Sequence, residues 1–201
     1  MKLYHNPASP YVRKVRVLLA ETGLDAHVTL APVAGHPTDP GTLPVSQNPL
    51  GKIPALERQD GPALYDSRVI CQYLSDMADG ALYPAKPRLW ETLTLEATAD
   101  GILDAAVLMV YEARSRAPEN QDSAWLDGQW AKINRSLDAI ESRWMSHLQG
   151  PLDIAQIAMG CALGYLDFRH GDRGWRTTRP ALTAWSTDFL ARPSMVATAP
   201  E

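Results

Sequence analysis

The composition of the chain changes near residue 89, and this change constrains the fold more than any other feature. All six tryptophans lie beyond that residue (Trp90, Trp125, Trp130, Trp144, Trp175 and Trp185). Most of the 16 prolines lie before it. The two parts are therefore built differently. We expect two domains, at residues 1–79 and 88–201, joined by a linker over residues 80–87.

The rest of the composition describes an ordinary globular protein. Of the 201 residues, 45% are hydrophobic and 21% are charged, and the net charge of −4 gives no electrostatic reason to expect a nucleic-acid partner. The N-terminal stretch has no apolar segment of the signal-peptide kind, and the most apolar run, residues 154–166, is too short to span a membrane. We expect a cytoplasmic protein without a membrane partner, with Cys71 and Cys161 as buried thiols.

The first half shows the order β-α-β followed by β-β-α. Strands are predicted over residues 1–5, 26–30, 55–57 and 63–65, and helices over residues 10–22 and 67–77. The stretch 31–52 is predicted to be mostly loop, with one helical turn near residues 43–46. Asp60-Gly61 is a hairpin signal, so the strands on either side of it should be antiparallel. The first two strands should be parallel and joined by a right-handed crossover.

The second half is predicted to be all helical. Helices are expected over residues 88–116, 123–149, 154–168 and 181–191. Asp153 and Gln156 have the spacing of a capping box at the start of the third of these helices. That helix is apolar on nearly every side, so we expect it to be the buried central helix of the domain.

Ser9 stands where a strand gives way to a helix, directly before Pro10. This pair is an ordinary way to begin a helix, with serine as the N-cap and proline in the first turn. A hydroxyl oxygen that accepts a backbone N–H can still donate its own proton. Because the N-terminus of a helix stabilises anions, Ser9 is either a cap alone or a cap that also stabilises a substrate thiolate.

Two further sites in the first half have both a structural and a functional interpretation. Pro54 is either an ordinary trans proline at the start of a strand or a cis proline, with the Ile53 backbone turned outward to pair with an extended peptide. Asp66 and Ser67 begin the next helix and can simply cap it. They can also recognise an amino-acid head group, the carboxylate of Asp66 binding its ammonium and Ser67 binding its carboxylate.

These sites follow the order and spacing of one known family. Over essentially its whole length, the chain resembles the glutathione transferases. The resemblance is carried by SPYVRKVRVLLAE, NPLGKIPAL, LYDSRVICQYL, and the late capping box with IAMGCALGYLDFR. It implies an α/β thioredoxin-like N-terminal domain of βαβ-ββα order, followed by an all-α helical-bundle domain.

The resemblance also implies roles for individual residues. Ser9 matches the hydroxyl that hydrogen-bonds the sulfur of glutathione. The residues that match the glutathione-binding positions are Lys52, Ile53, Pro54, Asp66 and Ser67. Among these, Ile53 would pair with the cysteinyl unit, Asp66 and Ser67 would hold the γ-glutamyl end, and Lys52 could reach the glycyl carboxylate. Tyr11, Tyr111 and Arg114 are candidates for the second-substrate pocket, with core packing as an equal alternative for Tyr111.

The chain departs from the family pattern in several places. Ser9 and Val12 replace the two sulfurs of the Cys-Pro-Tyr-Cys motif of glutaredoxins, so we do not expect thiol–disulfide exchange. Asp66 stands where the family usually has glutamate, which shortens its reach by one methylene. The five histidines show no metal-ligand spacing, so no metal is expected. Arg13 and its charged neighbours on the first helix are interpreted as solvated or dimer-facing.

The resemblance therefore predicts a glutathione transferase that acts as a homodimer. Glutathione would be the co-substrate, and its activated thiol would attack a small hydrophobic electrophile. A glutathione-dependent isomerase or dehalogenase is one alternative, although the isomerase branch carries Ser-Ser-Cys where this chain has Ser9-Pro10-Tyr11. A non-catalytic module of the same fold that binds glutathione or a hydrophobic ligand is another.

Overall fold

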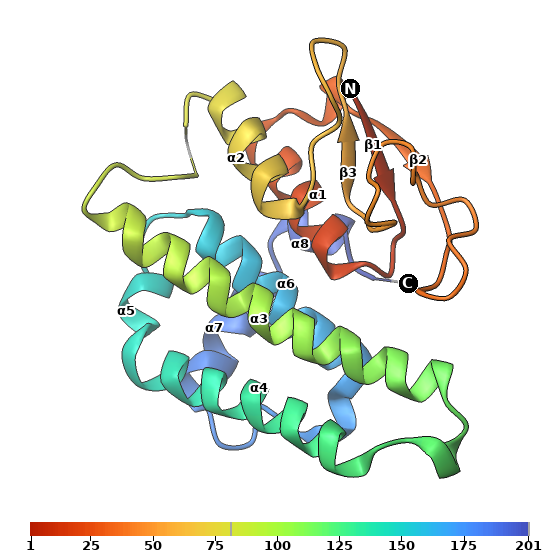
Figure 1. Cartoon of the computed structure of the whole chain (residues 1–201). Coiled ribbons are helices and arrows are strands. Elements are labelled where there is room, and N and C mark those ends of the chain that lie inside the picture. The colour runs from red at the N-terminus through yellow and green to blue at the C-terminus, as the bar shows by residue number, and fades with distance from the viewer. Residues whose placement is uncertain (81, 201) are drawn as a thin grey trace. The chain divides into compact units, whose positions relative to one another are not determined.

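The chain forms two compact units. A computed structural model describes residues 1–80 and 82–200, and Figure 1 shows its elements. Unit 1 comprises Met1–Leu89 and the C-terminal residues from Pro193, and unit 2 comprises Trp90–Arg192. The segment from Pro193, which the sequence analysis assigned to the helical domain, lies with unit 1. Residue 81 of the predicted linker and residue 201 lie outside the described residues.

Unit 1 contains a mixed sheet of three strands, in the order β2-β1-β3. The strands are β1 (Lys2–His5), β2 (Thr29–Pro32) and β3 (Ala55–Glu57). β1 runs parallel to β2 and antiparallel to β3, and the fully buried Leu3 lies opposite the fully buried Leu56. The predicted parallel pairing of the first two strands is confirmed.

The start of the second strand was predicted wrongly. Asp25–His27 form a short 3-10 helix, and β2 begins only at Thr29. The N-terminal ammonium donates to the His27 carbonyl at 3.0 Å, and the Thr29 N–H donates to the Met1 carbonyl at 3.0 Å. The residues before Thr29 are held in the 3-10 helix, because the His27 and Val28 N–H groups donate to the carbonyls of Leu24 and Asp25.

The hairpin is antiparallel as predicted, but it is shorter than predicted. Leu56 and Leu64 exchange two hydrogen bonds of 2.9 Å in an isolated bridge, and residues 63–65 do not form a strand. The Arg58 side chain donates to the Pro62 carbonyl at 3.0 Å, and Asp66 already caps the next helix. The helical turn expected near residues 43–46 is a hydrogen-bonded turn, in which the Pro44 carbonyl accepts from the N–H groups of residues 47 and 48.

Two helices complete the α/β part of unit 1, α1 (Pro10–Thr22) and α2 (Ser67–Met77). Their bounds are those predicted from the sequence. Gly23 ends α1 with a φ of 70°, a left-handed conformation that favours glycine. Fully buried side chains on both helices form the core with the sheet (Val15, Leu18, Ile70 and Leu74).

A further helix, α8 (Pro193–Ala197), packs on α1 and was not predicted. Arg13 donates from Nη2 to the Met195 carbonyl at 2.9 Å, and the Ser194 hydroxyl donates to the carboxylate of Glu21. Arg13 is only 5% exposed, so its interpretation as a solvated charge is wrong. Five residues are too few to show helical periodicity, and the sequence therefore gave no signal for α8.

Unit 2 is helical. Its helices are α3 (Arg88–Ser115, starting at the unit boundary), α4 (Ser123–Arg143), α5 (Met145–Leu148), α6 (Ile154–His170) and α7 (Pro180–Leu190). Short 3-10 helices occupy Pro118–Asn120 and Gly171–Arg173. Every residue from Ile154 to Leu166 is buried, which confirms α6 as the buried central helix. Cys71 in unit 1 and Cys161 in α6 are buried thiols and are not joined in a disulfide, as predicted.

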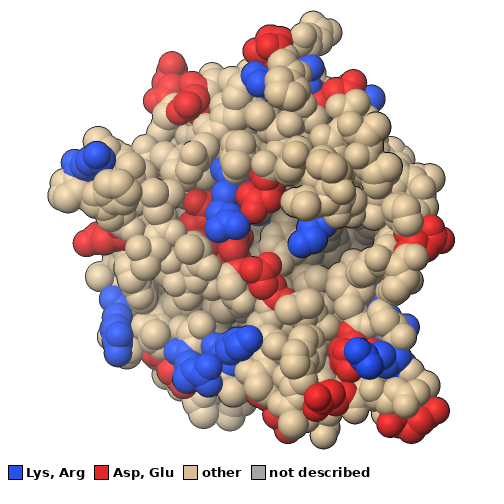
Figure 2. All heavy atoms as spheres, viewed as in Figure 1, with Lys and Arg blue, Asp and Glu red and all other residues tan. Residues whose placement is uncertain are grey.

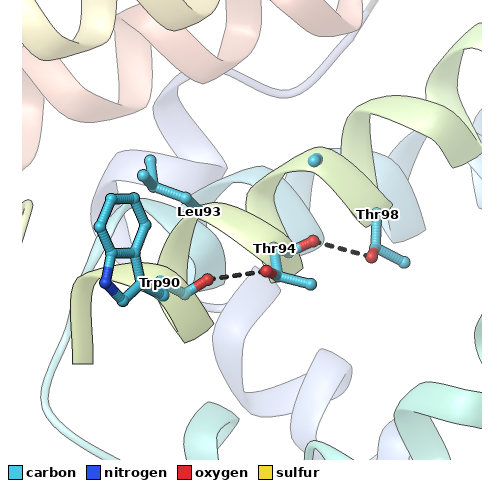
Figure 3. Close-up of a pocket in the computed structure, with 5 residues that line it drawn as sticks. Trp90, Leu93, Thr94 and Thr98 are labelled. Atoms are coloured by element: carbon cyan, nitrogen blue, oxygen red, sulfur yellow. Dashed lines mark hydrogen bonds between the residues drawn. The ribbon is translucent and has the colours of Figure 1, made fainter. Parts of the chain in front are cut away.

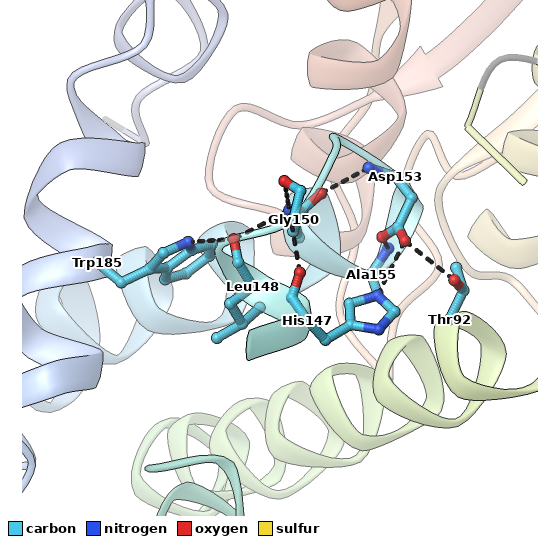
Figure 4. A network of polar contacts seen from close by, with 8 residues as sticks. Thr92, His147, Leu148, Gly150, Asp153, Ala155 and Trp185 are labelled. Carbon is cyan, nitrogen blue, oxygen red and sulfur yellow. Dashed lines mark hydrogen bonds and ion pairs between the residues drawn. The ribbon is translucent and has the colours of Figure 1, made fainter. Parts of the chain in front are cut away.

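The helix predicted over residues 123–149 is interrupted at Trp144, which has a φ of −115° and a ψ of 0°. Contacts from other parts of unit 2 fix the chain beyond the break (Figure 4). The Leu148 carbonyl accepts from Trp185 Nε1 at 2.8 Å and from Gln156 Nε2 at 3.0 Å. The Gly150 carbonyl also accepts from Gln156, at 3.0 Å. The local pattern of apolar residues cannot show these contacts.

The predicted capping box at the start of α6 is confirmed (Figure 4). Asp153 accepts from the Ala155 N–H at 3.0 Å, and its own N–H donates to Gln156 Oε1 at 2.6 Å. Asp153 Oδ2 also accepts from the Thr92 hydroxyl at 3.0 Å and lies 2.9 Å from His147 Nε2. The cap thus joins the start of α6 to α3 and to α5.

Candidate functional site

Ser9 is the N-cap of α1. Its backbone is extended, and its hydroxyl oxygen accepts from the Val12 N–H at 3.3 Å. Its carbonyl accepts from the Arg13 N–H at 3.0 Å, and Pro10 occupies the first turn. Ser9 is partly exposed. The capping contact uses only a lone pair of the hydroxyl, so the proton can be donated to another group.

The segment of residues 52–54 leads directly into β3. The Ile53–Pro54 peptide bond is cis, as is Tyr65–Asp66. Pro54 is buried, Ile53 is half-buried and Lys52 is exposed. Asn48, only 2% exposed, donates to the Lys52 carbonyl at 2.8 Å and accepts from the Leu50 N–H at 3.1 Å. Asn48 was not among the residues predicted from the sequence, although it begins the segment NPLGKIPAL.

Asp66 and Ser67 begin α2. The Asp66 carboxylate caps the helix by accepting from the Arg68 N–H at 3.0 Å, and Arg68 Nη2 forms an ion pair with it at 3.0 Å. The Asp66 side chain remains 54% exposed, whereas Ser67 is buried. The carboxylate is therefore accessible to a ligand, and Arg68 is a neighbour that the sequence analysis did not consider.

The charge of Asp66 follows from its neighbours. Burial tends to raise the pKa of its carboxyl group, but the hydrogen bonds from Arg68 and the charges of Arg68 and Lys14 outweigh burial and hold the pKa below 3.8. Asp66 is therefore ionised at neutral pH. A negative charge at this position suits the start of a helix and can also attract an ammonium group.

Three of the predicted positions lie at one edge of the sheet. Tyr4 lies opposite Ala55 in the antiparallel pair of β1 and β3, so the segments that carry Ser9 and Pro54 leave the sheet at the same end. Leu64 lies opposite Leu56. Asp66 follows Leu64 by two residues and Pro54 precedes Leu56 by two, so the two antiparallel segments continue toward the same end of the sheet. Residues distant in sequence therefore meet at one end of unit 1.

The candidates for the second-substrate pocket belong to both units. Tyr11 is half-buried on α1 in unit 1. Tyr111 is half-buried and Arg114 is exposed, and both lie in the last turns of α3 in unit 2. Tyr165, on α6, is 6% exposed and interacts electrostatically with both Tyr111 and Arg114. Tyr165 was not among the residues predicted from the sequence.

A hollow on α3 lies apart from these candidates in the sequence (Figure 3). It is open, and it is lined by Trp90, Leu93, Thr94, Ala97 and Thr98. The hydroxyls of Thr94 and Thr98 donate to carbonyls of their own helix, those of Trp90 and Thr94, at 2.7 and 2.8 Å. None of the predicted site residues lines this hollow, so it is not a candidate for the glutathione site.

The described residues were also searched for charged patches, metal sites and membrane-spanning helices. Acidic and basic side chains are interspersed on the face shown in Figure 2. In the described part of the chain, no group of three or more His, Cys, Asp or Glu side chains could hold a metal ion. No helix within residues 1–80 and 82–200 is long and apolar enough to cross a membrane.

Both halves of the chain match models of one protein family. Residues 8–77 match the glutathione S-transferase N-terminal domain, and residues 123–188 match the glutathione S-transferase C-terminal domain. The uncharacterized GST-like protein YibF of Escherichia coli (strain K12) is 36% identical, over 100% of this chain and 98% of its own length. The chain belongs to the glutathione S-transferase family. The predicted family and fold class are confirmed.

Solved structures of this family resemble this chain along its full length. One is a glutathione transferase family member from Pseudomonas fluorescens Pf-5 with bound glutathione. It has 50% identity and a TM-score of 0.96, covering 100% of this chain and 98% of its own. Another, from the same organism and with bound S-(propanoic acid)-glutathione, has 49% identity and a TM-score of 0.91, covering 100% of both chains.

Proposed function

We propose that this chain is a glutathione transferase that activates the thiol of glutathione for attack on a small electrophile. The observation that carries the proposal is the placement of Ser9, the Ile53–Pro54 segment and Asp66 at one edge of the sheet. Structures of a relative with about half of its residues identical hold glutathione or a glutathione conjugate. We infer that glutathione is the co-substrate here, bound in extended form along this edge.

Each part of this edge suits one part of glutathione. The ionised, exposed Asp66 would bind the ammonium of the γ-glutamyl end, and Ser67 at the first turn of α2 would bind its carboxylate. The Ile53 backbone would pair with the cysteinyl unit as an added strand does. The exposed Lys52 would reach the glycyl carboxylate. The sulfur would then lie near Ser9.

Ser9 would act by donating a hydrogen bond from its hydroxyl group to the sulfur, which stabilises the thiolate. A hydrogen bond to a charged group contributes about 1.5–3 kcal/mol, and one pKa unit corresponds to about 1.4 kcal/mol. One such bond, together with the N-terminus of α1, would therefore lower the thiol pKa from about 8.5 to near neutrality. The thiolate attacks the electrophile directly, so no covalent enzyme intermediate is needed. Tyr11, Tyr111 and Arg114 would hold the electrophile.

The test is ultraviolet difference spectroscopy of glutathione titrated into the protein from about pH 5 to pH 9, where a free thiol ionises. The variants are Ser9→Ala and Ser9→Gly, both of which lack the hydroxyl. Glycine caps a helix almost as well as serine, whereas alanine does not. If the hydroxyl activates the thiol, the thiolate band moves to higher pH equally in both variants, although only alanine weakens the cap.

Three outcomes separate the proposal from its alternatives. A band that is the same in all three proteins would make Ser9 a helix cap only. Bound glutathione with a thiolate band, but without turnover of diverse electrophiles, would favour a non-catalytic binding module. Turnover by isomerisation or dehalogenation, with no accumulated conjugate, would favour the isomerase or dehalogenase alternative.

We also propose that the protein is a cytoplasmic homodimer. The hollow on α3 in Figure 3 supports a partner surface, because Trp90 is 57% exposed beside Leu93 and large exposed aromatic side chains often mark interfaces. Light scattering coupled to gel filtration should give the mass of a dimer for the wild type and of a monomer for Trp90→Glu. A wild type that is monomeric at micromolar concentration would refute this assembly.

A further inference from the structure

The turn that carries Ser9 is built around Asn6. Residues 6–9 connect β1 to α1, and the Asn6 carbonyl accepts from the Ser9 N–H at 3.0 Å, which closes a β-turn. Asparagine at the first position and proline, here Pro7, at the second are both favoured in such a turn. Asn6 Oδ1 also accepts from the Ala8 N–H at 3.0 Å. Asn6 therefore holds the turn with both its backbone and its side chain.

The other end of the Asn6 amide fastens this turn to the sheet. Asn6 Nδ2 donates to the Val33 carbonyl at 3.3 Å. Val33 directly follows β2, and its own N–H donates to the His5 carbonyl at 2.9 Å. Because β2 runs parallel to β1, the two strands end at the same edge of the sheet. One side chain thus binds the turn through its oxygen and the end of β2 through its nitrogen, which requires an amide that carries both a donor and an acceptor.

Ser9 is therefore held from two directions. Toward the helix, its carbonyl accepts from the Arg13 N–H at 3.0 Å and its hydroxyl accepts from the Val12 N–H at 3.3 Å. These two bonds fix Ser9 relative to α1, but they do not fix it relative to the sheet. Toward the sheet, the side-chain contact is that of Asn6 with the Val33 carbonyl. The position of the Ser9 hydroxyl relative to the sheet edge thus depends on Asn6.

We propose that Asn6 is a positioning residue that holds the Ser9 hydroxyl within hydrogen-bond reach of the glutathione sulfur. This inference rests on the proposed transferase function, in which the Ile53 backbone and Asp66 fix glutathione along the sheet edge. The hydroxyl belongs to the cap of α1, so the geometry of its bond to the sulfur depends on the turn between β1 and α1. Such a bond weakens steeply when its geometry is poor, and a displacement of about 1 Å can cost about 100-fold in rate.

The variants separate the two contacts of the Asn6 side chain. Asn6→Ser keeps an oxygen that can accept from the Ala8 N–H, as serine does in similar turns, but it is too short to reach the Val33 carbonyl. Asn6→Ala removes both contacts. The matched control is Thr22→Val, because the Thr22 hydroxyl donates to the Leu18 carbonyl at 2.8 Å at the far end of α1. Urea denaturation measures how much stability each variant loses.

The quantity to compare is the pH midpoint of the thiolate band of bound glutathione. We expect Asn6→Ser to raise this midpoint by about half a pH unit or more, since the complete Ser9 hydrogen bond corresponds to about one unit or more. Asn6→Ala should raise it at least as far. Thr22→Val should keep the wild-type midpoint, even if it loses as much stability as Asn6→Ser, because loss of stability alone does not move the pKa of a bound thiol.

A double variant tests whether Asn6 acts through Ser9. If it does, Asn6→Ser combined with Ser9→Ala should have the same midpoint as Ser9→Ala alone. An unchanged midpoint in Asn6→Ser, or an equal shift with and without the Ser9 hydroxyl, would overturn the inference and leave the proposed function intact. If wild type gave no thiolate band, or if Ser9→Ala did not move it, the proposed role of Ser9 would fail and the inference with it.

Discussion

The Thr92 hydroxyl donates a hydrogen bond of 3.0 Å to the carboxylate of Asp153, 61 residues away in the sequence. Both residues are buried, and the same carboxylate oxygen lies 2.9 Å from His147 Nε2. Asp153 is also the N-cap of α6. The residue that starts the central helix of unit 2 is therefore bound from two other helices.

Replacing Thr92 by valine should destabilise the protein. Valine keeps the shape of the side chain but removes the donor, so a buried carboxylate oxygen loses one partner at a cost of about 1–3 kcal/mol. Urea denaturation measures the free energy of unfolding. The control is Thr187→Val, since Thr187 is exposed and donates only to the Thr183 carbonyl of its own helix at 2.9 Å. The control should lose less than about 0.5 kcal/mol. An equal loss in both variants would show that the Thr92 contact contributes nothing specific.

The contact between Arg13 and the Met195 carbonyl predicts that α8 stabilises unit 1. Arg13→Met keeps most of the apolar stem but leaves the buried carbonyl without this donor, which should cost about 1–3 kcal/mol. Limited proteolysis should then cut the C-terminal segment sooner than in wild type. Arg16→Met, on the same helix but partly exposed, is the control. If both variants resist proteolysis as wild type does, α8 is held by other contacts.

Because of the lowered pKa of His170, we expect the free energy of unfolding to fall in mildly acidic solution. Burial lowers the pKa of His170 below its usual 6.5, and the charges of Arg173 and Arg169 act in the same direction. They outweigh the hydrogen bond to the Ala106 carbonyl and the charge of Asp172, which raise it. A pKa lowered by folding gives stability that is present above pH 6.5 and is lost as the pH falls toward the folded value, because the unfolded chain binds the proton first.

The His170→Gln variant should therefore lose less stability than wild type between about pH 7.5 and 5.5. Urea titrations at each pH give the free energy of unfolding, and its change with pH is the slope to be compared. The control is His27→Gln, since His27 is exposed, and it should keep the wild-type slope. Some slope should remain in both variants, because burial and the charge of Arg16 also lower the pKa of His5. Identical slopes for wild type and His170→Gln would contradict the prediction.

The elements that could be predicted are those with local signals. The bounds of α1 follow from Ser9-Pro10 at its start and Gly23 at its end, and the capping box of α6 lies within four residues. The break at Trp144 was missed because it depends on Gln156 and Trp185, which bind carbonyls after it from other parts of the fold. Helical periodicity continues through Trp144, so no local signal opposed a single helix.

In the candidate site, too, some residues could be predicted from local sequence and others could not. Ser9 and Asp66 could be found because residues that cap helices are recognisable by type and position. The interactions of Tyr165 with Tyr111 and Arg114 could not be predicted, because they depend on α3 and α6 lying together, which no local pattern shows. Asn48 was missed for a similar reason, since its hydrogen bonds hold a loop that has no periodic pattern.

Asp66 offers a test of how the γ-glutamyl end of glutathione is held. Asp66→Asn keeps the oxygen that caps α2 but removes the charge and with it the ion pair with Arg68, so the loss of stability should be no more than about 1 kcal/mol. The dissociation constant of glutathione, measured by calorimetry, should rise about tenfold or more, since a charge-assisted hydrogen bond becomes a neutral one. Asp66→Glu restores the charge with a longer reach and should bind glutathione at least as tightly as wild type. If Asp66→Asn binds glutathione unchanged, the carboxylate serves the helix and its Arg68 partner alone, and the ammonium must be held elsewhere.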